Sequence, residues 1–107
     1  MTSDETLGGY VEAHACPPAF LGPDGISYSA EVYVDEDVQQ DGRFGAAILF
    51  VRWSAKGSQL EGHLETEYLA HADTPEAARC TVDRLTLFDL KGHLDRLVEE
   101  SKGRPDW

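Results

Sequence analysis

Cysteine and basic residues are both scarce in this 107-residue chain, and each scarcity excludes a class of protein. Two cysteines are too few for the disulfide framework that stabilises many small secreted domains. Nine lysine and arginine residues against twenty aspartate and glutamate residues give a net charge of −11. Nucleic-acid phosphates and anionic membranes are bound by clustered lysine and arginine, so we expect the chain to bind neither. A basic protein is the kind of partner that this charge permits.

Long hydrophobic runs are also missing. No apolar stretch approaches the ~18 residues that a membrane-spanning helix requires. The amino-terminal residues are acidic, and they lack the basic start and apolar centre of a signal peptide. We therefore predict a cytoplasmic protein that keeps its cysteines reduced.

No motif for a cofactor or a catalytic centre is recognisable in the chain. Gly42 and Gly45 precede a strand pattern rather than a helix, and no Gly-Lys-Ser/Thr follows them, so they do not form a phosphate loop. Cys80 lies among apolar residues at helical spacing, and nothing in the sequence identifies a base that would activate it. We predict no cofactor and favour a non-enzymatic protein, with an enzyme as the open alternative.

The composition is that of a folded domain, because 41% of the residues are hydrophobic. We predict a single domain over residues 1–107, with residues 1–8 disordered. Strands are expected at residues 10–16 and 26–35, and in the two arms of a hairpin over residues 44–72, because apolar and polar residues alternate there. Short polar connections between them predict an antiparallel meander.

The hairpin determines which side chains form the core. In its first arm we assign Leu49, Val51 and Trp53 to the core, opposite Leu60 and Leu64 of the second arm. A turn at Lys56-Gly57 pairs Trp53 with Leu60 and Arg52 with Glu61, whereas a turn at Gly57-Ser58 shifts the pairing by two residues. Both registers leave the two faces unchanged.

The opposite face of the first arm is unusually apolar for a solvated surface. Ala46, Ile48 and Phe50 lie on it, and Tyr33 of the preceding strand shares the same outer face of the sheet. A covering loop or terminus, a subunit interface or a ligand pocket would each account for such a patch. We predict that Ala46, Ile48, Phe50 and Tyr33 line an interface between two copies of the chain.

Helical periodicity replaces alternation in the last third of the chain. Thr74 has the character of an N-cap, and Pro75 suits the first helical position. The apolar stripe changes phase within residues 86–89, so we predict a break there, with Asp89 as an N-cap and a second helix over residues 90–101. A short fifth strand over residues 84–90 is the alternative.

Histidines, cysteines and carboxylates provide one further candidate site. His14 and Cys16 share the outer side of the first predicted strand, and His63 and Glu65 share that of the fourth. If those strands are neighbours, these side chains could bind a divalent metal such as zinc. Their spacing is plain strand alternation, however, which is typical of a solvated face, so we predict no metal.

These observations predict an α+β fold: a four-stranded antiparallel sheet, ordered as a meander, with two C-terminal helices packed on one face. The expected function is that of a small acidic interaction or accessory domain that self-associates as a homodimer through the outer face of its sheet. The alternatives are a small-molecule-binding protein or enzyme with its site between sheet and helices, and a metal site on the outer sheet face.

Overall fold

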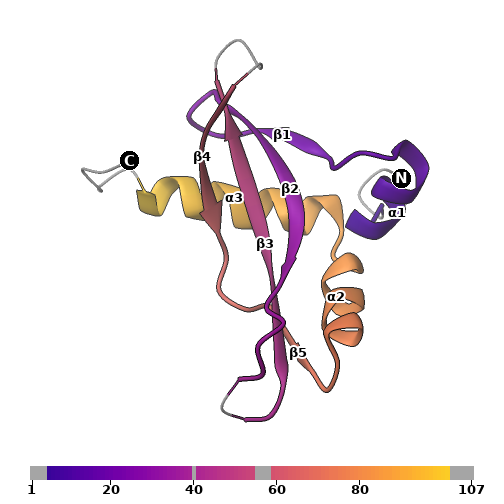
Figure 1. The fold of residues 1–107 in the computed structure, drawn as a ribbon. Coiled ribbons are helices and arrows are strands. Elements are labelled where there is room, and N and C mark those ends of the chain that lie inside the picture. Colours follow the sequence, from indigo (N-terminus) through magenta and orange to yellow (C-terminus); the bar gives the residue numbers. More distant parts are fainter. Residues whose placement is uncertain (1–4, 40, 55–58, 102–107) are drawn as a thin grey trace.

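The computed structural model describes residues 5–39, 41–54 and 59–101, whose arrangement is drawn in Figure 1. In chain order the elements are α1 (Leu7–His14), β1 (Ala19–Leu21), β2 (Ser27–Val34), β3 (Phe44–Trp53), β4 (Leu60–Glu65), β5 (Ala70–Ala72), α2 (Pro75–Asp83) and α3 (Leu87–Ser101). The sheet is antiparallel, with β1 to β4 in meander order and β5 paired with the start of β3. The predicted α+β class, with two C-terminal helices against a meander, is confirmed. The first strand of the meander is residues 19–21, not the predicted 10–16, and α1 and β5 are additional elements.

The amino-terminal segment is a helix and not the strand that we predicted over residues 10–16. Thr6 Oγ1 accepts a hydrogen bond from the Gly9 amide at 3.1 Å and caps the first turn of α1. Ala15, in a left-handed conformation with φ 58°, ends the helix. Local capping at both ends therefore outweighs the apolar–polar alternation of this segment.

The start of α1 is also anchored to the rest of the fold. Leu7 is only 1% exposed, and its amide donates a hydrogen bond to the Leu85 carbonyl at 2.8 Å. We expected residues 1–8 to be disordered; residues 5–8 are held in this way, and residues 1–4 lie outside the described part of the chain.

The core lies between one face of the sheet and the helices. The alternation in residues 26–35 predicts that Tyr28 and Ala30 face inward with Ile26, Val32 and Val34, and this is confirmed because Tyr28 and Ala30 are completely buried. Side chains from the helices, β2, β3 and β5 form one cluster, which consists of Leu7, Tyr28, Ala30, Ala46, Ile48, Phe50, Ala70, Ala78, Val82, Leu90, Leu94, Leu97 and Val98.

A β-bulge interrupts the hairpin between β3 and β4. Trp53 pairs with Leu60, as one of our two registers predicted, but the next residue of β3, Arg52, pairs with Gly62. Glu61 is therefore an extra residue in β4, opposite no residue of β3. Gly62 adopts φ 150°, which residues with a Cβ rarely take, and this conformation accommodates the bulge.

The bulge reverses our assignment of β3. Because side chains alternate, one extra residue moves every later residue of β4 to the other face relative to Leu60. Leu64 then pairs with Phe50 on the helix-covered side, not with Leu49. Ala46, Ile48 and Phe50 are core residues, each 0% exposed. The row of Leu49, Val51 and Trp53 lies on the side away from the helices, so its assignment to the core was wrong, as was that of Leu60, which is 64% exposed.

Two predictions concern the tip of the hairpin: an ion pair between its arms and the position of the turn. The ion pair between Arg52 and Glu61 is confirmed, with 3.2 Å between Nη1 and Oε1. The turn that we placed at Lys56-Gly57 or Gly57-Ser58 lies outside the described residues.

The C-terminal helices begin and end largely where the sequence predicted. Thr74 Oγ1 caps α2 by accepting from the Ala77 amide at 3.1 Å, and Pro75 is its first residue. The predicted break before α3 is confirmed, so the alternative fifth strand over residues 84–90 was wrong.

The cap of α3 differs from our prediction by three residues. Thr86 Oγ1 accepts from the Asp89 amide, and the Asp89 carboxylate accepts from the Thr86 amide, both at 3.1 Å. This reciprocal pair is a capping box with Thr86, not Asp89, at the N-cap. None of the helices in the described ranges is long and apolar enough to cross a membrane.

Two glycines provide a matched test of this packing. A Cβ added to Gly45 would approach the Tyr68 ring to 2.7 Å, whereas one added to Gly92 of α3 meets no atom within 4 Å. We expect Gly45→Ala to lower the free energy of unfolding by about 1–3 kcal/mol, measured by urea denaturation. Gly92→Ala should raise it by about 0.5–1 kcal/mol because alanine favours the helix. Equal effects of the two substitutions would contradict the close contact between Gly45 and Tyr68.

Candidate functional site

The four residues predicted to line an interface lie on two different faces of the sheet. Ala46, Ile48 and Phe50 are buried beneath the helices, so their placement on an exposed face was wrong. Tyr33 is 40% exposed and lies on the opposite face, as predicted. The positions of these four residues do not test self-association, which stays a prediction.

The sheet face opposite the helices is called the open face below. Its side chains come from the three long strands: Ser29, Glu31 and Tyr33 of β2, Ala47, Leu49, Val51 and Trp53 of β3, and Leu60, His63 and Glu65 of β4. The buried apolar residues of α1, α2 and α3 all belong to the core on the other side. In Figure 1, α3 accordingly lies behind the sheet, with the open face toward the viewer.

The open face has an apolar centre and charged sides. The row along β3 runs from Ala47 to Trp53, and the Trp53 indole N–H donates to Ser29 Oγ at 3.0 Å, which fixes the ring on this face. Leu60 beside it is 64% exposed. Glu31 on one side of the row and Glu65 on the other are exposed. An apolar centre with a polar rim is the usual anatomy of a protein interface.

Tyr68 closes one end of the open face. Its ring lies against Gly45, and its hydroxyl donates a hydrogen bond to the Asp35 carboxylate. This hydrogen bond, followed by one from the Asp37 amide, lowers the pKa of Asp35, and it raises the pKa of Tyr68 to about 12. At neutral pH the carboxylate is ionised and the phenol is neutral, so neither group is suited to general acid–base chemistry there.

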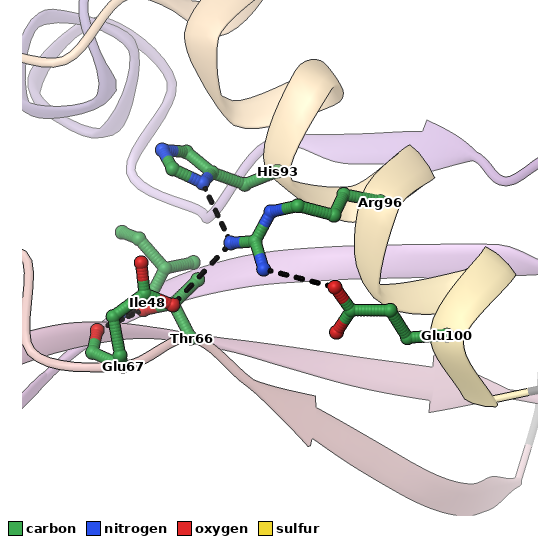
Figure 2. Close-up of polar contacts among 6 residues, drawn as sticks. All are labelled: Ile48, Thr66, Glu67, His93, Arg96 and Glu100. Atoms are coloured by element: carbon green, nitrogen blue, oxygen red, sulfur yellow. Dashed lines mark hydrogen bonds and ion pairs between the residues drawn. The ribbon is translucent and has the colours of Figure 1, made fainter.

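A cleft of about 400 Å³ adjoins Tyr68 on the open face. It is lined by Tyr33, Ala47, Glu65, Thr66, Glu67 and Tyr68. Thr66, one of these lining residues, links the segment after β4 to β3. Its side-chain oxygen accepts a hydrogen bond from the Ile48 amide at 3.0 Å and donates one to the Glu67 carbonyl at 2.7 Å (Figure 2).

Figure 2 also shows how α3 is tied to the segment after β4. The Arg96 guanidinium lies 3.4 Å from Glu67 and 3.5 Å from Glu100, and its Nη2 is 3.3 Å from His93 Nδ1. A hydrogen bond from the backbone amide of Glu67 and the charge of Arg96 lower the pKa of the Glu67 carboxyl. Arg96 is thus engaged by two carboxylates.

A second cleft lies between sheet and helices, in the position that our small-molecule alternative required. Its volume is about 340 Å³, and α1, α2 and β2 form its walls. The lining combines apolar and charged side chains: Leu7, Gly8, Val11, Glu12, Pro17, Ala30, Glu31, Val32, Arg79 and Asp83. Glu12 and Asp83 on the helices, against Arg79, give this rim a net negative charge.

The residues considered for a metal site are not brought together as that hypothesis required. His14 belongs to α1 and not to a strand, whereas His63 and Glu65 lie on β4 at one edge of the sheet. Within residues 5–39, 41–54 and 59–101, no three histidine, cysteine or acidic residues are grouped closely enough to hold a metal ion. Cys16 and Cys80 are both exposed and unbridged.

Comparison with known proteins supplies no functional assignment: no protein family, no curated protein and no solved structure matches the chain. The candidate sites rest on the geometry described above. The open face escaped sequence reasoning because both rows of β3 are apolar. The one local signal was Gly62, since a glycine inside a strand often marks a bulge.

The hydrogen bond between Tyr68 and Asp35 predicts the pH dependence of stability. This hydrogen bond raises the pKa of Tyr68 to about 12 in the folded protein, and burial raises the pKa of Tyr28 to about 12. The contribution of both phenols to stability is therefore present below pH ~10 and is lost as the pH rises towards 12. The lowered pKa of Asp35 has the opposite sense, so its contribution is present above pH ~4 and is lost on acidification.

Tyr68→Phe should therefore flatten both the alkaline and the acidic limb of a plot of unfolding free energy against pH. In this variant the phenol no longer titrates, and the Asp35 carboxylate has lost its donor. Urea denaturation across the pH range measures the two slopes. Wild-type slopes in Tyr68→Phe would show that this contact does not form in solution.

Proposed function

We propose that this chain is a non-enzymatic interaction domain whose open face binds a second copy of itself. The observation that carries the proposal is the apolar row on the side of β3 away from the helices, in which Leu49 and Trp53 are half-buried and Val51 is 8% exposed. The exposed side chains of Tyr33 and Leu60 border this row. An exposed apolar patch on a small domain usually marks a contact surface.

The geometry of the open face favours a two-fold arrangement. Two sheets pack face to face at ~10 Å with their strands within about 30° of each other, and an isologous dimer of this kind uses the same patch on both copies. Tyr33 and Leu60 stand on opposite sides of the β3 row, so a two-fold axis through the row brings each over the partner's apolar centre. Glu31 and Glu65 then remain at the rim, in contact with water.

The size of the patch limits the affinity. Three strands at ~4.8 Å spacing and about seven paired residues at ~3.3 Å give a projected area of roughly 300–400 Å² per copy. Standard interfaces bury ~800 Å² per partner, so we expect a weak dimer that depends on concentration. Each copy also carries a net charge of −11, and this repulsion opposes association at low ionic strength.

Light scattering over a range of protein concentrations tests the dimer. The dimer fraction of the wild type should rise with concentration, and it should rise further when salt is increased from about 0.05 to about 0.5 M, because screening weakens the repulsion. Leu49→Lys should abolish dimerisation by placing a charge at the centre of the patch. Val38→Lys changes the charge equally at an exposed position between β2 and β3 and should leave the dimer intact.

Two outcomes would overturn the proposal. One is a wild type that stays monomeric at every concentration and salt; the other is a Leu49→Lys variant that dimerises like the wild type. Circular dichroism of both variants establishes that they are folded.

The cleft between α1, α2 and β2 supports a second candidate function, the binding of a small molecule. Its volume of about 340 Å³ lies at the lower end of the ~300–1,000 Å³ typical of ligand sites. An apolar floor at Leu7, Ala30 and Val32, with an excess of carboxylates at the rim, suits an amphipathic cation. A monomeric wild type would make this cleft the leading candidate site.

A further inference from the structure

The free edge of β4 presents unpaired backbone groups. β4 is the last strand in the order β1-β2-β3-β4, and no described strand pairs with its other side. The Thr66 amide donates a hydrogen bond to the Ile48 carbonyl of β3 at 3.0 Å. In an antiparallel pair, every second residue forms hydrogen bonds to the neighbouring strand, so the backbone of Leu64, two residues before Thr66, bonds to Phe50 of β3. The backbone N–H and C=O groups of His63 and Glu65 therefore point away from the sheet.

Helix α3 extends beyond this edge. Figure 1 shows that α3 crosses behind β2, β3 and β4 and that its C-terminal end emerges past β4. A groove of about 390 Å³ lies between β4 and the last turns of the helix. It is lined by His63, Leu64, Glu65, Glu67, Arg96, Leu97, Glu100 and Ser101. An additional strand along β4 would lie over this part of α3, as β2 to β4 lie over the preceding turns.

The charges of the groove decide what kind of strand fits. Among its lining residues, Glu65, Glu67 and Glu100 provide three carboxylates, against one guanidinium from Arg96 that already contacts two of them. Charged side chains on an edge strand, together with a bulge such as that at Glu61, oppose edge-to-edge pairing with an identical strand. The edge of β4 therefore repels a second copy of this acidic chain and attracts a segment rich in lysine and arginine.

We propose that an extended basic segment of another protein binds here as an additional strand. Its backbone pairs with His63 and Glu65, and one alternate set of its side chains enters the groove over Leu64 and Leu97. The other set, which is basic, lies on the opposite side of the added strand, beside Glu65. This is β-augmentation, in which backbone hydrogen bonds supply affinity and alternate side chains supply specificity. It uses the edge of β4 and is independent of dimerisation through the open face.

Fluorescence anisotropy with a labelled peptide of alternating lysine and valine tests the proposal. The 107-residue chain should bind this peptide, with an affinity that falls as salt rises, and should not bind the matching peptide of alternating glutamate and valine. Because alternate amides of an added strand face β4, N-methylation of one alternate set should abolish binding while methylation of the other set is tolerated.

Two charge reversals on the protein complete the experiment. Glu65→Lys should weaken binding of the lysine–valine peptide about three- to tenfold, because it reverses an exposed contact at the groove. Glu36→Lys changes the net charge equally at an exposed position between β2 and β3, outside the groove, and should change the affinity less than about twofold. Leu49→Lys should still bind the peptide, which separates this site from the proposed dimer.

The proposal is overturned if the lysine–valine peptide fails to bind, or if the two N-methylated peptides bind equally. It is likewise overturned if Glu65→Lys and Glu36→Lys weaken binding to the same extent, since the attraction would then reflect net charge alone.

Discussion

Side chains on a strand alternate between two faces, and for that reason the extra residue at Glu61 determines which row of β3 meets the helices. Gly62 takes the backbone conformation that the bulge requires, and beyond it Leu64 comes to lie on the same side as Phe50. The core between sheet and helices is assembled from that row. The other row of β3, which contains Leu49, faces away from the helices and forms the centre of the open face.

Local signals in the sequence predicted the elements that depend on local chemistry. The N-cap at Thr74 with Pro75 after it, the break between the C-terminal helices and the inward row of β2 all follow from caps and periodicity. The face of β3 could not be predicted in this way, because its two rows are about equally apolar and the choice depends on the geometry of the neighbouring strand. The helix at residues 7–14 was missed because its cap at Thr6 lies in a polar segment that resembles a loose terminus.

The predicted interface residues were correct or wrong for the same reason. Tyr33 lies on the open face, as predicted, because periodicity gives the orientation of β2 correctly. Ala46, Ile48 and Phe50 lie in the core instead, because the orientation of β3 depends on the bulge in β4. The two surfaces that the fold leaves available differ in chemistry. The open face offers apolar side chains, whereas the edge of β4 offers backbone hydrogen bonds among carboxylates. We propose that the chain uses the first with a second copy of itself and, because its net charge is −11, the second with a basic partner.

The assignment of the two faces of β3 can be tested by comparing Phe50→Ala with Leu49→Ala in equilibrium unfolding at a protein concentration low enough to keep the chain monomeric. Phe50 is 0% exposed in the core, so its truncation should cost about 3–5 kcal/mol of unfolding free energy. Leu49 lies on the open face and its truncation should cost less than about 1.5 kcal/mol. The reverse order, with Leu49→Ala the more destabilising, would contradict the bulge and the orientation of the whole sheet.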